Sequence, residues 1–332
     1  LSGTFTIRQG MVENRDLMLE ERVRDLLVGA GLTEIVSYRM TSPEREARLQ
    51  GEQAARDVSD AGYVRLANPI SPERRVMRRS LLSSVLESLQ SNLRHRERGA
   101  LFEIGQVYGP EQGAVLPGEE RRLAMALTGA ATPVNWLDGS PRERDFFDLK
   151  GVLERLFDAL SLEGVRFEAT THPTFQVGRV AEIRIGERQV GIMGEVAPDV
   201  RAMLALPEQR IMAADLDLDA LLEAVPRVKV VSEIPRFPAV LQDLAVVVGE
   251  DAPAAEVVET IWESGPQELV RVELFDLYRG PSIPDGTKSL AYALQYQSSD
   301  HTLTDDEVAV FHRTIGDALR QRLGAKIRGE DI

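Results

Sequence analysis

The sequence predicts an α+β protein of two domains, a mainly antiparallel sheet with helices followed by a ferredoxin-like domain. Over residues 1–228, strand-like segments occur in adjacent runs with helices between them, and regular βαβ alternation is missing. Pro226, Pro235 and Pro238 then crowd one short segment and force extended structure before each proline. Within residues 229–332, the apolar patterns follow the order βαββαβ.

The first domain is expected to open with a helix, because Val23, Leu26 and Ala30 recur at helical spacing before Gly31. Residues 33–40 read as a strand. A second amphipathic helix carries apolar residues from Leu82 to Leu93. The remaining expected elements are a strand at 100–108, a strand at 121–129, a helix at 145–160, a hairpin at 179–196, a short helix at 197–206 and a strand at 209–218.

The second domain shows its pattern most clearly in its last two elements. Thr304 and Glu307 have the spacing of a capping box, and Leu303 with Val308 supplies a hydrophobic staple, so a helix is expected to start there. In residues 288–296 large apolar side chains alternate with small or polar ones. One face of this strand is therefore expected in the core, and the other is expected to be flat and open to a partner.

Composition excludes several classes of protein. Of the 332 residues, 43% are hydrophobic and 28% charged, which is ordinary for a core-forming chain, and no apolar run is long enough to span a membrane. Cysteine is absent, which removes disulfides and thiol chemistry and fits a reducing cytoplasm. The net charge of −14 argues against a general polyanion binder, so any nucleic-acid contact must come from a local cluster.

No motif for catalysis stands out. Phosphate loops, dinucleotide fingerprints, nucleophile elbows and zinc motifs are missing, and the four histidines are scattered. Asp215, Asp217 and Asp219 have a metal-loop spacing, but a strand end with solvated acids is the favoured interpretation. His172, before a proline, is interpreted as a loop histidine. The run "RHRER" at 94–98 suits a helix C-terminus, and a polyanion or partner contact is the alternative.

Two groups of motifs together resemble one family. "NPISPERRVMRRSLLSSVLESLQSNL", "LFEIGQVY", "FFDLKGVLERL", "HPTFQVGRVAEI" and "GIMGEVAPDV" are similar to the catalytic-like module of the bacterial phenylalanyl-tRNA synthetase β subunit. "EIPRFPAVLQDLAVVV", "LFDLYRG", "IPDGTKSLAYALQYQ", "HTLTDDEV" and "AKIRG" are similar to that subunit's ferredoxin-fold anticodon-binding domain. The order is that of the family, and the resemblance covers nearly the whole chain.

The resemblance implies a division of labour. Residues 1–228 would be a class II synthetase-like module without a catalytic site, and residues 229–332 the anticodon-binding domain. The sequence agrees, because "LFEIGQVY" offers Glu103, Gln106 and Tyr108 but no arginine to grip an α-phosphate, and no motif 3 follows. ATP and Mg²⁺ would then bind to the α subunit, or outside this chain, and no metal is expected here.

The partners implied are the α subunit, in a heterotetramer of two α and two β chains, and tRNA-Phe, in the cytoplasm. The chain starts without an initiator Met, so we expect a fragment that begins after the family's helical B5 domain. Two departures are visible. Gln242 replaces a usual arginine near the expected RNA surface, and "HPTFQVGR" stands where the family has "HPGR", which is expected to lengthen a turn.

The anticodon-binding role meets an electrostatic difficulty. From Glu233 onward, nine Lys and Arg stand against eighteen Asp and Glu, a net charge of −9, whereas RNA-binding domains usually carry a basic footprint. Stacking and edge contacts on a sheet could hold unpaired bases instead. The candidate RNA-binding residues are Arg236, Phe237, Tyr278, Lys288, Ser289 and Arg328. Core packing remains the alternative for the two aromatic residues, and solvated charge for Lys288 and Arg328.

Two other functions remain open. The chain could be a free-standing regulatory module that binds RNA or a small molecule. It could also be an independent class II-type enzyme, which the missing ATP-binding arginines disfavour.

Overall fold

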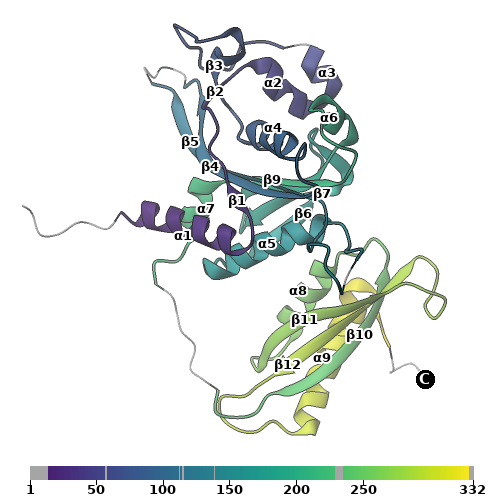
Figure 1. The fold of residues 1–332 in the computed structure, drawn as a ribbon. Helices are drawn as coiled ribbons and strands as arrows, with labels where there is room; N and C mark the ends of the chain where they lie inside the picture. The colour runs from purple at the N-terminus through teal and green to yellow at the C-terminus, as the bar shows by residue number, and fades with distance from the viewer. Residues whose placement is uncertain are drawn as a thin grey trace, which may run out of the picture. The chain divides into compact units, whose positions relative to one another are not determined.

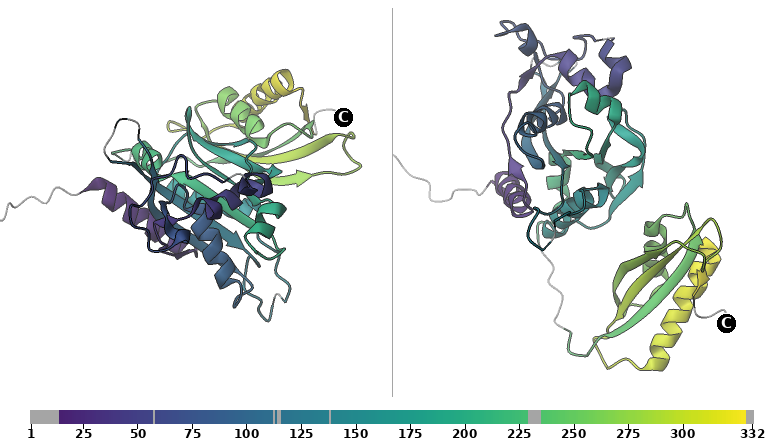
Figure 2. Two further views of the ribbon diagram at one scale, coloured as in Figure 1. Left: turned by 90° about the horizontal axis from the view of Figure 1, so that it is seen from above. Right: turned by 45° about the vertical axis from the view of Figure 1, so that its right-hand side comes forward.

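The structure is a computed structural model that describes residues 14–56, 58–111, 113, 116–137, 139–228 and 235–328. The chain divides into two compact units, Leu1–Lys229 and Val230–Ile332 (Figures 1 and 2). Within the described part of the chain, no helix combines the length and apolar character needed to cross a membrane.

The first unit is built on a seven-stranded sheet. Its strands have the order β1-β4-β5-β9-β8-β7-β6, and every pairing is antiparallel except that of β1 with β4. A separate two-stranded sheet pairs β2 with β3. The strands are β1 (Thr33–Glu34), β2 (Met40–Thr41), β3 (Val76–Met77), β4 (Gly99–Gly109), β5 (Gly118–Thr128), β6 (Val165–Ala169), β7 (Phe175–Ile185), β8 (Arg188–Val196) and β9 (Ile211–Asp217).

Helices cover both faces of this large sheet (Figure 1). One core joins the sheet to α1, α5 and α7, and a second core joins its other face to α4 and α6. The helices are α1 (Arg15–Gly29), α2 (Pro43–Ala47), η1 (Arg48–Gln50), α3 (Gly51–Arg56), η2 (Pro72–Arg74), α4 (Leu82–Asn92), α5 (Phe146–Ala159), α6 (Pro198–Met203) and α7 (Leu218–Ala224). Because helices cover both faces of the sheet, the last six residues of the central strand β5, from Leu123 to Thr128, are all buried, whichever face they point to.

The second unit has the predicted ferredoxin-like plan. The chain runs β10 (Val240–Gly249), α8 (Ala254–Ser264), β11 (Leu269–Tyr278), β12 (Thr287–Tyr296), α9 (Asp305–Leu323) and β13 (Lys326–Ile327). The strands form an antiparallel sheet in the order β11-β12-β10-β13. Both helices pack on one face of it (Figure 2), so the α+β prediction and the βαββαβ order are confirmed.

Local signals in the second unit also form as predicted. The side chains of Thr304 and Glu307 make the reciprocal capping box of α9, and Leu303 and Val308 are both buried in the core. The alternation of apolar residues breaks at Leu274 and Phe275, which predicts either a bulge or the end of pairing. The pairing of β11 with β12 shifts register there, between Leu274 and Asp276, so the first alternative is the observed one.

Three local predictions for the first unit are wrong. The segment 33–40 forms only the two-residue strand β1 before its chain turns irregular. Asp215 is not solvated as predicted, because its side chain is only 14% exposed. Strand β9 does end at Asp217 as predicted, but Asp217 also caps the unpredicted helix α7 by accepting a hydrogen bond from the Ala220 N–H. The long "HPTFQVGR" segment makes a register jump inside β7, between Phe175 and Val180, because the extra residues bulge out of the strand.

Candidate functional site

The open face of the second sheet is the flat surface that the alternation in β12 predicts. Leu290, Tyr292 and Leu294 point to the helices and are fully buried. The residues between them, Ser289, Ala291 and Ala293, therefore point to the opposite face. Among the described residues of the second unit, no helix packs on that face, and Ala291 and Ala293 are partly exposed there.

Three of the predicted RNA-binding residues come together on this open face. Tyr278 at the end of β11 pairs directly with Ser289 of β12. Arg328 donates its backbone N–H to the carbonyl oxygen of Ala245, which brings its guanidinium carbon to 5.8 Å from the centroid of the Tyr278 ring. The hydroxyl of Tyr278 lies 3.1 Å from Oγ of Ser282, which fixes the ring at its outer end. Ser289 is only 4% exposed.

The other three predicted residues lie elsewhere. Lys288 precedes Ser289 in β12 and therefore lies on the helix-covered face of the sheet, where its Nζ donates to the carbonyl oxygen of Glu250 at 2.7 Å. Arg236 is exposed and Phe237 half-buried, at the end of the sheet where the Phe237 carbonyl accepts from Gln297 Nε2 at 2.7 Å. That end is about 23 Å from the row of Ser289, given the usual rise per strand residue.

Strand register also corrects the expected charge distribution. Gln242 pairs with Leu294 and so has helix-side parity, which places it off the open face. Two arginines near Arg328 in the sequence lie on the helix layer, where Arg320 pairs with Asp317 and Arg322 with Glu263.

Acidic residues on the open face were missed by the sequence reasoning. Asp243 pairs with Ala293 across the strands, and Glu273 and Asp276 occupy the same face on β11. Lys326, opposite Val247, adds a cation. The alternation of side chains along each strand could have predicted these positions, but only once the pairing of the strands was known.

In the first unit, the polar side chains of β4 are engaged in an internal network. Arg78 and Glu103 form a buried ion pair, with side chains 3% and 2% exposed and Nη1 of Arg78 2.7 Å from Oε1 of Glu103. Ser37 donates its hydroxyl to the second carboxylate oxygen at 2.6 Å and accepts from Arg78 at 2.9 Å. Arg78 Nε also donates to the carbonyl oxygen of Gln106.

The remaining polar groups of this strand are also occupied. Arg39 donates to the Tyr108 hydroxyl at 3.1 Å, and that hydroxyl donates to Oε1 of Gln106 at 3.3 Å. The close approach of Arg78 requires a glycine in the strand, because a Cβ at Gly105 would lie 2.4 Å from Nη2 of Arg78. Glu103, Gln106 and Tyr108 therefore serve the fold and leave no free acid, base or cation along β4.

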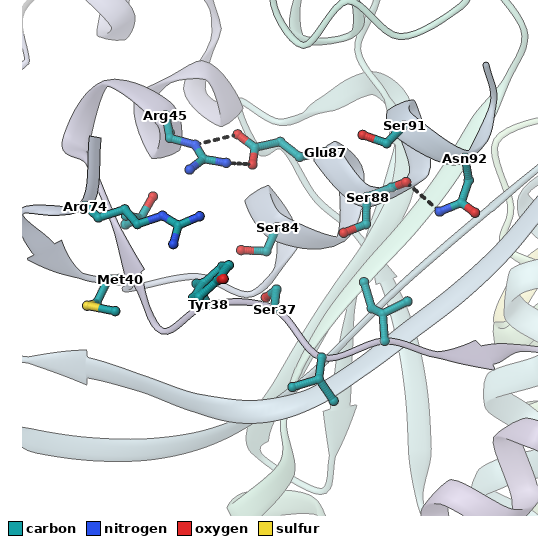
Figure 3. A pocket seen from close by; sticks show the side chains of 13 residues that line it. Ser37, Tyr38, Met40, Arg45, Arg74, Ser84, Glu87, Ser88, Ser91 and Asn92 are labelled. Atoms are coloured by element: carbon teal, nitrogen blue, oxygen red, sulfur yellow. Dashed lines mark hydrogen bonds and ion pairs between the residues drawn. The ribbon is translucent and has the colours of Figure 1, made fainter. Parts of the chain in front are cut away.

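A pocket of about 600 Å³ lies in front of this network (Figure 3). Its floor is the segment around Ser37 and Tyr38, and its wall is a row of serines on α4. Arg45 and Glu87 are joined by hydrogen bonds at its rim, and the guanidinium of Arg74 lies 3.6 Å from the centroid of the Tyr38 ring. These are positioning contacts, and the lining contains no histidine, aspartate or lysine that could serve as a base.

A second pocket, of about 460 Å³, is lined by Asp215 and Asp217, two of the three acids that the sequence predicted to be solvated. Burial raises the pKa of Asp215, and the hydrogen-bonded Arg122 at 2.6 Å works against that rise. Burial likewise lowers the pKa of His172, whose Nδ1 accepts from the Thr174 N–H. Glu46 accepts the backbone N–H groups that follow Arg78. Each carboxylate is thus bound to a group of the protein itself.

No group of three or more potential ligands suited to a metal ion occurs among the residues that the structure describes. The fold and these sites define a class: a synthetase-type sheet whose polar strand is internally paired, joined to a ferredoxin-fold domain with an open face. The comparisons with known proteins make the family specific. Residues 5–218 match the model of the phenylalanyl tRNA synthetase beta chain CLM domain, and residues 235–328 match the ferredoxin-fold anticodon binding domain.

The chain belongs to the phenylalanyl-tRNA synthetase beta chain family. It is 41% identical over 332 residues to the phenylalanine–tRNA ligase beta subunit of Moorella thermoacetica, covering 99% of this chain and 40% of that protein. It is 38% identical over 306 residues to the beta subunit of Symbiobacterium thermophilum, covering 92% of this chain and 34% of that protein. The chain therefore spans about two fifths or less of these relatives.

A solved pyrrolysyl-tRNA synthetase from Desulfitobacterium hafniense is 17% identical, with a TM-score of 0.48 over 62% of this chain and 67% of that one. That likeness is too slight to support a functional argument.

Proposed function

We propose that this chain is the C-terminal part of a non-catalytic β subunit of phenylalanyl-tRNA synthetase. In this role it supports ATP-dependent phenylalanylation of tRNA-Phe and contributes no catalytic residue. The observation that carries the proposal is the buried network of β4. The charges of Arg78 and Glu103 neutralise each other, and the Ser37 hydroxyl forms hydrogen bonds with both. A strand with its charges internally paired suits a scaffold better than a nucleotide site. ATP and Mg²⁺ then belong to the α subunit or to parts outside this chain.

The α subunit is proposed to dock on the surface in front of that network. Anchoring Ser37 from behind presents its neighbours outward, so that Val36 is 90% and Tyr38 62% exposed. Exposed apolar side chains held by a rigid support are typical of protein interfaces. The assembly proposed is a heterotetramer of two α and two β chains in the cytoplasm.

The anticodon region of tRNA-Phe is proposed to bind the second domain. Tyr278 and Arg328 offer a ring and a guanidinium close together on an open sheet, which suits stacking and edge contacts with unpaired bases. Ser289 pairs with Tyr278 but is only 4% exposed, so its hydroxyl is proposed to support this site and not to contact bases directly. Because acids share the face, recognition must depend on these placed groups. Lys288, Arg236 and Phe237 then contact RNA only outside this face. We propose domain limits of 1–228 and 229–332.

Co-expression with the α subunit and measurement of phenylalanylation test the proposal. A complete β subunit lacking residues 233–332 should lose most of its kcat/KM for tRNA-Phe. Arg328→Gln should raise KM for tRNA-Phe, whereas Arg313→Gln, an exposed cation on α9, should not. Equal charging by the truncated and complete subunits would rule out the anticodon role. Charging by this chain without any α subunit would rule out the scaffold role.

A further inference from the structure

Two separate segments of the first unit bring arginines together at a place that the proposed function does not use. Arg94, Arg96 and Arg98 follow α4 and are all exposed. Arg144 lies on the returning arm of the loop between β5 and α5, and its N–H donates to the carbonyl oxygen of Gly129 at 2.9 Å. The segments touch closely, because a Cβ at Gly129 would lie 2.5 Å from the carbonyl oxygen of Glu97. We call these four residues the arginine cluster.

The positive charge of the arginine cluster is not neutralised by ion pairs. Within the described ranges, none of its four members has a carboxylate within ion-pair distance, and Arg144 donates to the carbonyl oxygen of Gly99 instead. Burial, followed by the like charge of Arg98, lowers the pKa of Arg144. The neighbouring Arg142 is different, since Asp148 pairs with it.

The dipole of α4 does not account for this arrangement. Its negative end favours cations in and near the last turn, which suits Arg94, but the effect fades over one turn and does not reach Arg98 or Arg144. Residues 94–98 hold three arginines and Glu97, a net charge of +2, whereas residues 142–145 hold two arginines and two acids and are neutral, in a chain of net charge −14. Exposed like charges repel one another, and a bound anion relieves that repulsion.

The loop that carries Arg144 also carries an exposed aromatic side chain. Ala130 and Glu143 form a β-bridge that closes the loop into a hairpin. At its tip Trp136 is 94% exposed, and Asn135 accepts the Leu137 N–H at 2.9 Å, which shapes the turn. The tip lies at most about 22 Å along the chain from the hairpin base beside the arginines.

We propose that the arginine cluster and Trp136 form a second RNA-binding surface, which contacts tRNA outside its anticodon stem–loop. This inference rests on the proposed function, which supplies a tRNA. Guanidinium groups bind phosphate oxygens through paired, charge-assisted hydrogen bonds, and a free indole ring stacks on an unpaired base. Arg and Trp are also common at protein interfaces. RNA is the favoured ligand because the proposed function already supplies a tRNA, a polyanion that matches exposed arginines without carboxylate partners.

The test measures binding of two labelled RNAs to the 332-residue chain by fluorescence anisotropy. One probe is full-length tRNA-Phe and the other its isolated anticodon stem–loop. The variant is Arg94→Gln with Arg96→Gln and Arg98→Gln. The matched control is Arg48→Gln with Arg155→Gln and Arg210→Gln, three exposed arginines on scattered elements that give the same change in net charge.

The cluster variant should bind full-length tRNA about tenfold more weakly at ~0.1 M salt, with a salt slope smaller by roughly two to three. Its affinity for the stem–loop should not change, and the control variant should match the parent with both probes. Trp136→Ala should weaken binding of full-length tRNA by roughly fivefold or more.

Full-length tRNA binding equal to that of the parent, in affinity and salt slope, would overturn the proposal. So would a cluster variant that binds RNA normally but no longer co-purifies with the α subunit, because the surface would then be a protein interface. If the chain bound full-length tRNA through the arginine cluster but did not bind the stem–loop, only the anticodon role would be contradicted. The experiment therefore distinguishes failure of the anticodon role from failure of the second RNA-binding surface.

Discussion

Glu103 is the residue on which the polar network of the first unit depends. Its carboxylate is nearly inaccessible and receives hydrogen bonds from Arg78, the Ser37 hydroxyl and the Ser37 backbone N–H. Buried pairs of this kind add little net stability, but removing one partner leaves an uncompensated charge in the interior. The network therefore acts mainly by holding the segment of Ser37 in one position.

Glu103→Ala should lower the free energy of unfolding of the first unit by about 3–5 kcal/mol. The control is Glu273→Ala, which removes an exposed partner of Arg271 on β11 and should cost less than ~1 kcal/mol. Urea unfolding followed by circular dichroism measures both. A loss below ~1 kcal/mol for Glu103→Ala would mean that the buried guanidinium finds another partner or water.

Gly105→Ala tests whether the position of Arg78 is rigid. A side chain that could swing away would accept the new methyl group, but Arg78 is held by Ser37, Glu103 and the Gln106 carbonyl. We expect a loss of about 1–3 kcal/mol in the same assay. Gly109→Ala on the same strand meets no atom within 4 Å and should be close to neutral. Equal effects of the two substitutions would contradict the rigid network.

At the scale of elements, α9 begins at a capping box that a histidine reinforces. Glu307 accepts from the Thr304 N–H at 2.8 Å, and Nε2 of His301 lies 3.0 Å from its other oxygen. Hydrogen bonds from Thr304, and then from His301, lower the pKa of Glu307 to about 2 from an ordinary value of 4.5. A carboxyl whose pKa is depressed by folding stabilises the fold above its unfolded pKa, and this stabilisation is lost as pH falls.

The second unit should therefore lose stability between about pH 5 and pH 2, partly because Glu307 becomes protonated. Glu307→Gln should flatten this part of the pH profile, and Asp306→Asn in the same helical turn should leave it steep. Fluorescence of Trp262 on α8, measured in a Trp136→Phe background, reports unfolding of this unit. Identical profiles for Glu307→Gln and the parent would contradict the cap as the cause.

Element identity followed from local sequence wherever the signal was local. The capping box of α9 and the bulge at Leu274 could be predicted, because both depend on residues a few positions apart. Helix α7 was missed because its cap, Asp217, was interpreted as a solvated acid at the end of a strand. The strand expected at 33–40 shortens because Ser37 is drawn into the Glu103 network from a distant part of the chain.

At the scale of the whole molecule, the two units have separate cores. The residues of the first unit form two clusters on either face of its sheet, and the second unit has its own cluster around Tyr292 and Tyr296. No buried cluster within the described residues contains members of both units. Damage to one core should therefore leave the other intact.

Hydrogen exchange measured by mass spectrometry tests this independence. Tyr292→Ala removes a fully buried ring and should destabilise the second unit by about 3–5 kcal/mol. Exchange should rise in β10, β12 and α9 but remain unchanged in β4 and β5. Leu153→Ala, buried in the first unit, should show the reverse pattern. Increased exchange in both units for either variant would indicate coupled folding.

The sequence alone determined the fold class, the βαββαβ order of the second unit and its family resemblance, because these depend on periodicity, caps and motif order along the chain. It also predicted the strands that carry Tyr278, Lys288 and Ser289. Only the tertiary structure decided which of the candidate RNA residues meet. Tyr278, Ser289 and Arg328 share one face through strand pairing between residues far apart, whereas Lys288, one position from Ser289, points the other way. The tertiary structure also showed that Glu103 is paired with Arg78 and that the arginine cluster has no carboxylate partner among the described residues. Ion pairing depends on neighbours in space, which the sequence alone does not give.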